Sequence, residues 1–325
     1  MIPFGWMIPV AIATGNTFVL KAASLTPMTS NRILHLLYEV GLPKGVVNWV
    51  TCTRNEAELL LKHPDVKGIT YVGSTSVGRH IYKTAAEHGK RVQVLGEAKN
   101  HGLVLRDANI EQAARVIINS TYGCAGMRCM ALPVVCVEEA VADEFVGYLK
   151  RFAQELKVGC AYDPATELGP VVSAEHKKSV SDWIAKGVEE GAELVLDGRG
   201  VVGDKEIFGP VTCIKRVRDF EHGLETMNAS EFANGSCIFT ESGQEAREFI
   251  RRTHGGMVGV NVGIPVPISV FPFSGHKNSF FGDLHVLGLD GLAFFTETKS
   301  VTTRWFGRAA KAEKVGTWEG TITRT

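Results

Sequence analysis

The sequence predicts an α/β fold in which parallel β-sheets are covered by helices. Short β-rich runs alternate with amphipathic helical runs along most of the chain, and this alternation is typical of parallel sheets with helices on their faces. The 35 glycines among 325 residues suit the many tight turns that such a fold needs. With 45% hydrophobic residues, the chain is long enough to form two domains, each with its own core.

The alternation is clearest in the first hundred residues. Strands are predicted where β-branched and aromatic residues gather, and helices where apolar residues recur every three or four positions. The expected strands are 17–20, 46–50 and 68–72. The expected helices are 30–40, 56–61 and one that begins at about Ser76, with a turn at 41–45.

The same rhythm continues through the rest of the chain. We expect strands at 103–105, 132–137, 193–196, 212–215, 236–240 and 257–261. We expect helices at 110–121, 140–158, 176–190, 220–227 and 244–253. The stretch 263–281 is rich in proline and glycine and should form an ordered loop, whereas residues 307–325 lack an apolar period and should form a loose tail.

Charge and hydropathy limit the classes of partner. Lys plus Arg and Asp plus Glu number 35 each, so the formal net charge is zero and nothing favours a nucleic acid or an acidic membrane surface. No apolar run reaches the ~18 residues that a membrane span needs. The apolar start, residues 1–9, lacks a basic region and is interrupted by prolines, unlike a signal peptide. We therefore expect a cytoplasmic protein.

The seven cysteines do not have the pattern of a disulfide framework. Their number is odd and they are scattered through apolar contexts, which is typical of a reducing compartment. Cys124 and Cys129 stand five positions apart, but no second cysteine pair or nearby histidine completes a metal site. For any one of these cysteines the ordinary interpretation is a buried thiol that packs as a small hydrophobe.

The loop 72–78 has the form of a phosphate-binding turn. A strand leads into Gly73 and Ser74 and then into a helix, so backbone N–H groups and a hydroxyl meet at a helix N-terminus. Alone, this pattern is weak, because an ordinary capped helix after a strand looks the same. This loop lacks the Gly-x-Gly-x-x-Gly fingerprint of classical dinucleotide sites.

The stretch 122–131 has the form of a nucleophile turn. Cys129 lies in a glycine-flanked turn between a predicted helix and a predicted strand, with the cation of Arg128 beside it. A nearby cation favours the thiolate form, which is the nucleophile. Read in isolation, a buried structural thiol would remain the better interpretation of Cys129.

Taken together in their order, the motifs resemble the aldehyde dehydrogenase superfamily, with a match from residue 1 to about residue 306. These motifs are residues 15–21, 41–45, 73–78, 128–131, 206–210 and 273–277. A second set of segments looks like the CoA-acylating methylmalonate-semialdehyde dehydrogenase branch of that superfamily. These segments are residues 95–101, 128–131, 259–267, 281–285 and 301–305.

The resemblance implies covalent catalysis by Cys129. The thiol would attack a semialdehyde, a small-molecule substrate, and pass hydride to a nicotinamide cofactor, which leaves a thioester. Hydrolytic relatives have a glutamate where this chain has Val94, and valine cannot activate water. The resemblance and the missing base both indicate coenzyme A as co-substrate, with propionyl-CoA or acetyl-CoA as product. Arg128 matches a residue that holds the substrate carboxylate, with a surface or interface ion pair as the alternative.

The resemblance also indicates where NAD would bind. Lys21 corresponds to a lysine at the adenosine ribose, Gly73 and Ser74 to the pyrophosphate turn, and Glu206 and Phe208 to residues at the nicotinamide ribose and ring. NAD-dependent relatives often have glutamate where this chain has Ser24, and that glutamate repels a 2′-phosphate. NADP is therefore an alternative, although NAD is the expected cofactor.

Four departures from the family pattern bear on activity. The asparagine of the family's oxyanion hole would lie upstream of Met1, and a segment between Val202 and Gly203 is missing. Glu97 replaces a glycine near the expected cofactor pocket, and Met127 replaces a polar residue before Arg128. Loss of an oxyanion donor typically costs ~10²–10³ in rate. An inactive, truncated fragment and a hydrolytic semialdehyde dehydrogenase are the two alternative functions.

The expected architecture follows from the resemblance. Residues 1–96 should form an incomplete Rossmann-like, NAD(P)-binding domain, and residues 97–285 an α/β catalytic domain of the aldehyde dehydrogenase fold. Residues 286–325 should form a C-terminal oligomerisation segment and tail. Because a strand near 296–306 joins subunits in the family, a homodimer or homotetramer is expected.

Overall fold

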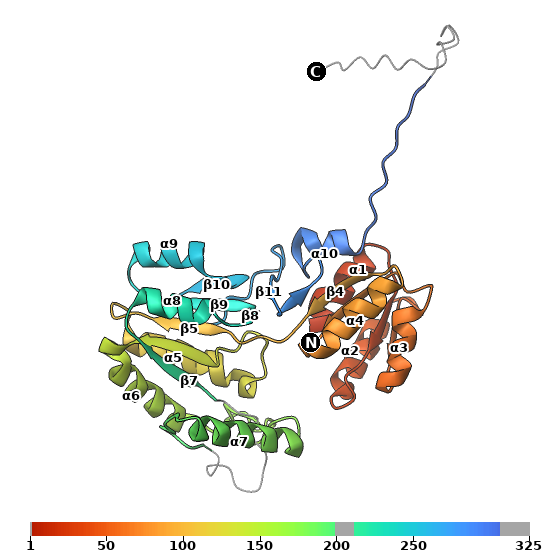
Figure 1. Ribbon diagram of the computed structural model, residues 1–325. Coiled ribbons are helices and arrows are strands. Elements are labelled where there is room, and N and C mark those ends of the chain that lie inside the picture. The colour runs from red at the N-terminus through yellow and green to blue at the C-terminus, as the bar shows by residue number, and fades with distance from the viewer. Residues whose placement is uncertain (1, 199–210, 306–325) are drawn as a thin grey trace. The chain divides into compact units, whose positions relative to one another are not determined.

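The computed structural model describes residues 2–198 and 211–305 of the chain (Figure 1). It divides into a compact unit, Met1–Phe295, and a second unit, Thr296–Thr325. In the second unit, residues 296–305 adopt neither helix nor strand, and Trp305 is 91% exposed. All helices and strands described below therefore belong to the first unit.

The first unit begins with a helical segment that supports a small parallel sheet. The elements are η1 (Pro3–Met7), α1 (Ile8–Ala13), β1 (Phe18–Lys21), α2 (Pro27–Glu39), β2 (Val47–Val50) and α3 (Arg54–Lys62). Strands β1 and β2 pair in parallel. Ile8, Leu20, Leu34 and Val47 form the buried core between the helices and this sheet, so the apolar start of the chain is used as packing surface.

A second sheet carries the predicted phosphate-binding turn. Its strands β3 (Gly68–Val72) and β4 (Arg91–Leu95) are parallel and are joined through α4 (Thr75–Glu87). A late two-residue strand, β12 (Phe280–Phe281), pairs antiparallel with β4. The same late region contributes β11 (His276–Lys277), which pairs with β8 (Phe232–Ala233). Segments more than 180 positions apart in the sequence, such as Phe280 and Leu95, therefore meet at β4.

The largest sheet has five parallel strands in the order β10-β9-β5-β6-β7. They are β10 (Met257–Val260), β9 (Gly235–Phe239), β5 (His101–Val104), β6 (Val134–Glu138) and β7 (Cys213–Val217). Successive side chains point to opposite faces: Val104 packs in one core and Leu103 in the other. Burial on both faces explains why β5, β6 and β9 are mainly apolar rather than alternating. The edge strand β7 is mostly exposed and includes Lys215 and Arg216.

Helices cover both faces of this sheet, as Figure 1 shows. The core that contains Val104 includes residues of α5 (Ile110–Tyr122) and α6 (Glu139–Glu155). The core that contains Leu103 includes residues of α8 (Phe220–Asn228) and α9 (Gly243–Arg252). The remaining helices are α7 (Ala174–Glu189), which has no buried residue, and α10 (Gly288–Phe294). The predicted α/β fold is confirmed.

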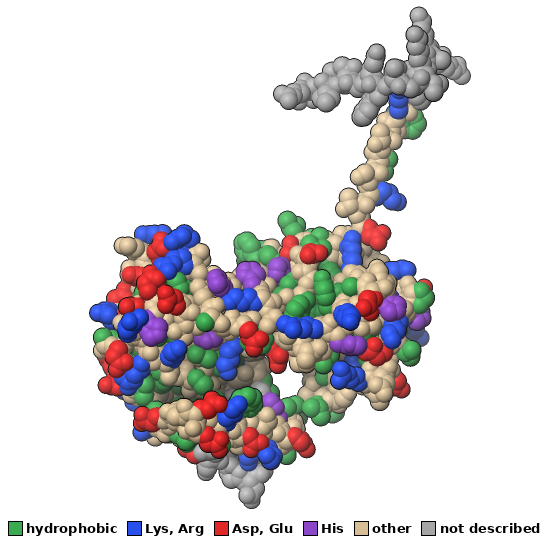
Figure 2. Space-filling model, in the orientation of Figure 1, with side chains coloured by type: hydrophobic (Ala, Val, Ile, Leu, Met, Phe, Trp, Pro, Cys, Tyr) green, Lys and Arg blue, Asp and Glu red, His purple; other side chains and the backbone are tan. Residues whose placement is uncertain are grey.

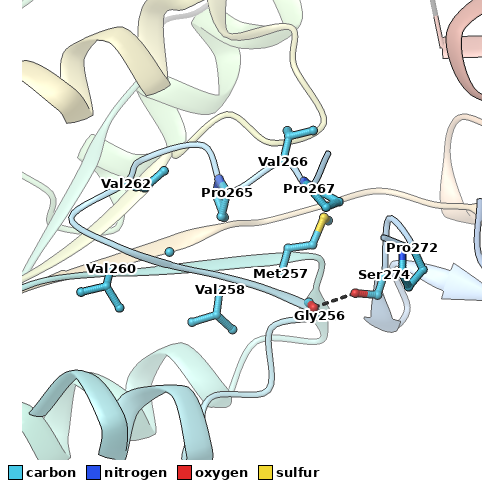
Figure 3. Close-up of a pocket in the computed structure, with 11 residues that line it drawn as sticks. Gly256, Met257, Val258, Val260, Val262, Pro265, Val266, Pro267, Pro272 and Ser274 are labelled. Atoms are coloured by element: carbon cyan, nitrogen blue, oxygen red, sulfur yellow. Dashed lines mark hydrogen bonds between the residues drawn. The ribbon is translucent and has the colours of Figure 1, made fainter. Parts of the chain in front are cut away.

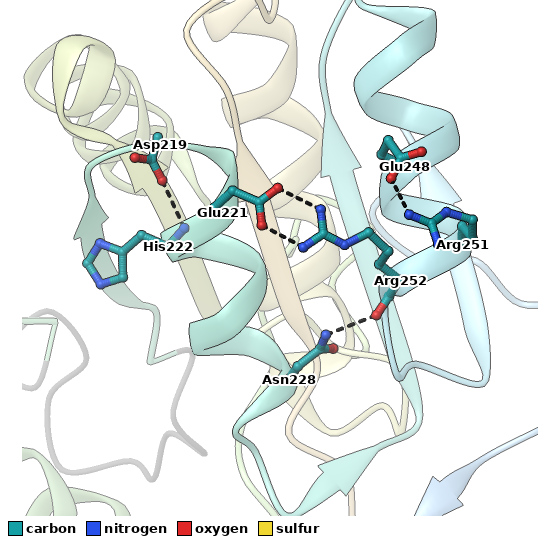
Figure 4. Close-up of polar contacts among 7 residues, drawn as sticks. All are labelled: Asp219, Glu221, His222, Asn228, Glu248, Arg251 and Arg252. Atoms are coloured by element: carbon teal, nitrogen blue, oxygen red, sulfur yellow. Dashed lines mark hydrogen bonds and ion pairs between the residues drawn. The ribbon is translucent and has the colours of Figure 1, made fainter.

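Polar contacts join α8 to α9 outside the apolar core (Figure 4). Arg252 donates to both carboxylate oxygens of Glu221, at 2.6 and 2.5 Å. Asp219 caps α8 by accepting from the His222 N–H at 2.9 Å. The Asn228 amide donates to the Arg252 carbonyl at 3.0 Å, so the end of α8 is tied to the end of α9.

Most predicted elements are present within a few residues of their expected ends. One strand was wrong: residues 193–196 form no strand, and Leu194, Val195 and Leu196 are 42%, 42% and 38% exposed. A strand needs a partner for its backbone groups, and this segment pairs with no strand in the described ranges. Strand β4 was missed, and the loop expected at 263–281 contains both β11 and β12. The expected tail, 307–325, lies outside the described residues.

Acidic and basic side chains are interspersed on the face shown in Figure 2. This distribution agrees with the equal numbers of acidic and basic residues in the sequence. Within the part of the chain that the structure describes, no helix is both long and apolar enough to cross a membrane.

Candidate active site around Cys129

The turn that carries Cys129 begins with an unusual backbone. After α5 ends at Tyr122, the segment η2 (Gly123–Gly126) places Cys124 and Ala125 in the left-handed region, with φ of 52° and 54°. Non-glycine residues adopt this conformation at a cost, and such residues concentrate at functional sites. The chain then turns at 128–131, where the Ala131 N–H donates to the Arg128 carbonyl at 3.0 Å.

The thiol of Cys129 lies half-buried against an apolar cluster. Buried members of this cluster include Leu95, Met130 and Phe280. Burial raises the pKa of the Cys129 thiol, and hydrogen bonds from the backbone N–H groups of Cys129 and Met130 oppose that rise. The resting group is therefore a protonated thiol, and the two backbone N–H groups favour its thiolate form.

Arg128 is exposed and folds back over the preceding turn. Its Nε donates to the Cys124 sulfur at 3.2 Å, and its guanidinium lies over Gly123. A Cβ at position 123 would lie 2.8 Å from the Arg128 Nη1 atom, so glycine allows this close approach. No ion pair of Arg128 occurs among the residues of the described ranges, and its guanidinium is open to an added anion.

The predicted phosphate-binding turn lies between β3 and α4. Gly73 donates its N–H to the Leu95 carbonyl at 3.1 Å, and Ser74 stands at the N-cap of α4 without making a side-chain cap bond. The Tyr71 ring folds over this turn, because a Cβ at Gly73 would lie 2.2 Å from the Tyr71 hydroxyl. Burial raises the pKa of Tyr71, and hydrogen bonds from Ser74 oppose the rise.

Glu97 meets the same helix N-terminus. Its Oε2 accepts from the Thr75 N–H at 3.2 Å, and its own N–H donates to the Thr75 Oγ1 at 3.0 Å. The Thr75 hydroxyl in turn donates to the Asn278 carbonyl at 3.0 Å. A carboxylate therefore already occupies one of the donors that a phosphate would use.

The arrangement fits a dinucleotide phosphate, with two internal competitors, Tyr71 and Glu97. Helix α4 is thirteen residues long, so its N-terminus carries a substantial partial positive charge, and the Ser74 hydroxyl makes no cap bond that a ligand would have to break. Lys21 and Ser24 are exposed at the end of β1 and just beyond it, on a different sheet from Gly73 and Ser74. The Glu97 carboxylate and the Tyr71 hydroxyl are the groups that a bound phosphate would have to displace.

Two predicted cofactor residues, Glu206 and Phe208, lie outside the described residues, as does the junction of Val202 and Gly203. Val94 is described and is fully buried in β4. Its side chain packs against α4, since a Cβ at Gly78 would lie 2.6 Å from the Val94 Cγ1 atom. The position of the hydrolytic base is thus a packed aliphatic group.

Two residues that sequence reasoning missed contact the nucleophile turn directly. Asn100 and Asn234 are buried, and the side-chain amide of each donates to the carbonyl oxygen of Cys129, at 2.9 and 3.1 Å. The sequence contained a signal for both residues. Asn100 immediately precedes the apolar strand β5, and Asn234 immediately precedes Gly235, the first residue of β9. Buried amides in such places usually satisfy specific backbone groups.

A hollow of about 430 Å³ lies along β10 and the loop after it (Figure 3). It is lined mainly by valine and proline side chains, and the Ser274 hydroxyl donates to the Gly256 carbonyl at 2.7 Å on its rim. Met257 lines the hollow and also belongs to the apolar cluster against which Cys129 packs. Among the described residues, no group of His, Cys, Asp and Glu side chains could hold a metal ion.

Comparison with known proteins places these features in a family context. The sequence profile described as "Aldehyde dehydrogenase family" matches residues 1–205 and 200–301. Malonate-semialdehyde dehydrogenase 2 of Geobacillus kaustophilus is 47% identical over 323 residues, which cover 92% of this chain and 67% of that protein. Malonate-semialdehyde dehydrogenase 1 of Oceanobacillus iheyensis is 42% identical, over 94% of this chain and 68% of that protein.

Solved structures give a similar picture. A protein from Sinorhizobium meliloti, assigned as a methylmalonate-semialdehyde dehydrogenase and complexed with NAD, superposes with a TM-score of 0.90 at 39% identity, over 94% of this chain and 67% of that one. Methylmalonate-semialdehyde dehydrogenase from Oceanimonas doudoroffii superposes with a TM-score of 0.91 at 38% identity, over 94% and 68%. The chain spans about two thirds of the length of these proteins.

Proposed function

Because the chain belongs to the aldehyde dehydrogenase family, we propose that it oxidises malonate or methylmalonate semialdehyde with NAD and transfers the acyl group to coenzyme A. The observation that carries the proposal is the Cys129 turn, in which a half-buried thiol is followed by buried Met130 and preceded by the exposed guanidinium of Arg128. The substrate class is supported by relatives that are named for malonate semialdehyde and methylmalonate semialdehyde.

Cys129 is the nucleophile in this proposal. Its thiol loses a proton and the sulfur attacks the aldehyde carbon, which forms a thiohemiacetal. The N–H groups of Cys129 and Met130, which oppose the rise in the thiol pKa, stabilise the negative charge on the sulfur before the attack. NAD, when bound, would supply the hydride acceptor for the thiohemiacetal carbon, and a thioester on Cys129 would remain.

The second half of the reaction depends on whether water or the thiol of coenzyme A attacks the thioester. A valine side chain packed against α4 occupies the position of the hydrolytic base, so no carboxylate at residue 94 can activate water. A thiol such as that of coenzyme A needs no such base to compete, since thiols are strong nucleophiles at neutral pH. Loss of CO₂ from the malonyl-type product would give propionyl-CoA or acetyl-CoA.

Arg128 is proposed to hold the carboxylate of the semialdehyde. Its guanidinium is exposed, lies one residue from the nucleophile and contacts the Cys124 sulfur at 3.2 Å. A planar guanidinium binds a carboxylate with two parallel hydrogen bonds, which a lone sulfur contact cannot match. Binding of substrate would therefore turn the Arg128 fork away from Cys124.

The cofactor residues remain proposals as well. Lys21 and Ser24 would contact the adenosine ribose, and Gly73 and Ser74 the pyrophosphate at the start of α4. Glu206 and Phe208 would contact the nicotinamide half. Ser24 leaves room for a 2′-phosphate, yet the similarity to an NAD-complexed relative supports NAD as the preferred cofactor.

The proposal is tested by following NADH formation by the purified 325-residue chain with methylmalonate semialdehyde, with and without coenzyme A. We expect turnover that requires coenzyme A and is lost in the Cys129→Ala variant. Equal turnover without coenzyme A would favour a hydrolytic dehydrogenase instead. No turnover from soluble, folded protein would support the inactive-fragment alternative.

A further inference from the structure

The carbonyl group of Cys129 accepts two side-chain hydrogen bonds at once. The Nδ2 atoms of Asn100 and Asn234 lie 2.9 and 3.1 Å from this oxygen. Both asparagines are nearly inaccessible to solvent, at 3% and 5% exposure. In a buried environment such amide–carbonyl contacts are strong, and their geometry is held by the surrounding packing.

Asn100 joins the nucleophile turn to the large sheet. Besides the Cys129 carbonyl, its amide donates to the Ala131 carbonyl at 2.7 Å. Its Oδ1 accepts from the Gly235 N–H at 2.8 Å, so the side chain bridges the turn and the first residue of β9. Asn100 itself directly precedes β5, which neighbours β9 in the sheet. All of its side-chain polar groups are used.

Asn234 contacts the same turn from the position directly before β9. Its amide donates to the Cys129 carbonyl and also lies 3.1 Å from the Met130 sulfur. Its backbone carbonyl accepts from the Met257 N–H at 3.0 Å, which fixes it between β9 and β10. Because β5 and β9 are parallel, Asn100 and Asn234 stand at the same edge of the sheet and converge on one atom.

The converging bonds act on the peptide unit that faces the sulfur. The Cys129 carbonyl and the Met130 N–H belong to the same planar amide. Hydrogen bonds to the carbonyl polarise this amide and strengthen the N–H as a donor. A single donor would already satisfy the carbonyl, so the second amide exceeds what burial alone requires.

We propose that Asn100 and Asn234 are positioning residues that hold and polarise the Cys129–Met130 peptide so that its N–H faces the nucleophilic sulfur. The proposal rests on the proposed role of Cys129 as nucleophile. Neither asparagine touches the substrate in this role; both act through the turn. Their loss should make the thiolate of Cys129 harder to form, beyond any effect on folding.

The test is the pH profile of Cys129 alkylation by iodoacetamide, read from the peptide that carries Cys129 so that the other six cysteines do not interfere. The key variant is Asn234→Ala, because Asn100 still satisfies the Cys129 carbonyl and keeps the turn folded. The matched control is Asn228→Ala. That asparagine also bridges backbone groups, by donating to Arg252 and accepting from His254, but makes none of the contacts at Cys129.

We expect Asn234→Ala to slow alkylation at neutral pH by about three- to tenfold, the effect of one lost hydrogen bond. Its profile should shift to higher pH, while Asn228→Ala alkylates like the wild type. Asn100→Asp, which keeps the acceptor for Gly235 and removes the amide donor, should shift the profile in the same direction. A profile of Asn234→Ala that coincides with that of the wild type would overturn the proposal.

The measurement needs no aldehyde, NAD or coenzyme A. If the chain forms no NADH yet the two asparagine variants shift the alkylation profile, the proposed reaction fails and the inference about the turn stands. If the chain is active and the profiles coincide, the inference fails and the proposed function stands.

Discussion

At the scale of single residues, the Cys129 sulfur is subject to two opposing effects. Partial burial against the apolar cluster disfavours the charged thiolate, whereas the N–H groups of Cys129 and Met130 favour it. Burial is the larger effect, so the pKa of this thiol lies above its ordinary value. At neutral pH the Cys129 thiol is therefore mainly protonated, and little thiolate is present.

This balance predicts the pH dependence of Cys129 alkylation. An ordinary cysteine has a pKa of about 8.5, and burial moves that of Cys129 upward. The rate of reaction with iodoacetamide should therefore keep rising as the pH increases beyond about 8.5, because the thiolate is the reacting form. Glutathione serves as the reference thiol. A rate for Cys129 that levels off at lower pH than the reference would contradict the assignment.

A second residue-scale prediction concerns Glu97. Its carboxylate accepts from the Thr75 N–H at the start of α4, where a dinucleotide phosphate is proposed to bind. Glu97→Gln removes the negative charge from this helix N-terminus and should raise the affinity for NAD about fivefold, since such a charge is worth about 1 kcal/mol. Isothermal titration calorimetry with NAD measures the change.

The control for this measurement uses the other end of the same helix. Glu87→Gln neutralises the last residue of α4 and should leave NAD affinity unchanged. Adenosine, which lacks phosphate, should bind both variants as it binds the wild type. Equal gains in NAD affinity from Glu87→Gln and Glu97→Gln would show that net charge, and not the Thr75 contact, is responsible.

At the scale of elements, glycines decide how closely helices approach the large sheet. A Cβ at Gly223 of α8 would lie 2.4 Å from the Leu103 Cδ1 atom of β5. Gly187 of α7 has no atom within 4 Å of the corresponding position. Glycine is therefore required for close packing at position 223, whereas a larger side chain would meet no obstacle at position 187.

This contrast predicts substitutions with opposite signs. Gly223→Ala should destabilise the protein by about 1–3 kcal/mol, the usual result of overpacking a core. Gly187→Ala should stabilise it by about 0.5–1 kcal/mol, because alanine loses less backbone entropy in a helix. Urea denaturation of both variants gives the two values. A stabilising Gly223→Ala would mean that α8 can move away from β5 at no cost.

Sequence patterns identified most elements because each pattern is local. Strand β3 was predicted at residues 68–72, the bounds that the structure has, since its apolar and β-branched run is flanked by turn residues. Residues 193–196 have the same kind of local pattern, yet they pair with no strand among the residues that the structure describes. Strand β4 was not predicted, because its sequence includes the polar residues Arg91 and Gln93. Its pairing with β3 and β12 makes this segment a strand.

At the scale of the whole molecule, buried thiols stand on both faces of the five-stranded sheet. Cys136 of β6 packs with the α8 and α9 side, and Cys237 of β9 with the α5 and α6 side. Burial raises the pKa of Cys136 to about 11 and that of Cys237 to about 12. Both thiols therefore stay protonated in the folded state at alkaline pH.

These two buried thiols should lower the free energy of unfolding as the pH rises. In the unfolded chain both thiols ionise above about pH 8.5, so the folded state binds more protons and the free energy of unfolding falls. At pH 9.5 the loss should be about 1.4 kcal/mol per thiol relative to pH 7.5. Urea denaturation at both pH values measures it. The difference should be smaller by that amount in Cys136→Ala and in Cys237→Ala, and an unchanged difference would contradict the assignment.

The sequence by itself determined the α/β fold, the family and the turns that carry Cys129 and Ser74, because these depend on local runs of residues in a fixed order. The roles proposed for Cys129, Arg128 and the cofactor residues stay predictions. Only the tertiary structure decided what surrounds those turns: Asn100 and Asn234 converge on the Cys129 carbonyl, and Glu97 meets Thr75. The asparagines come from segments more than a hundred positions apart, and only the pairing of parallel strands brings such segments together.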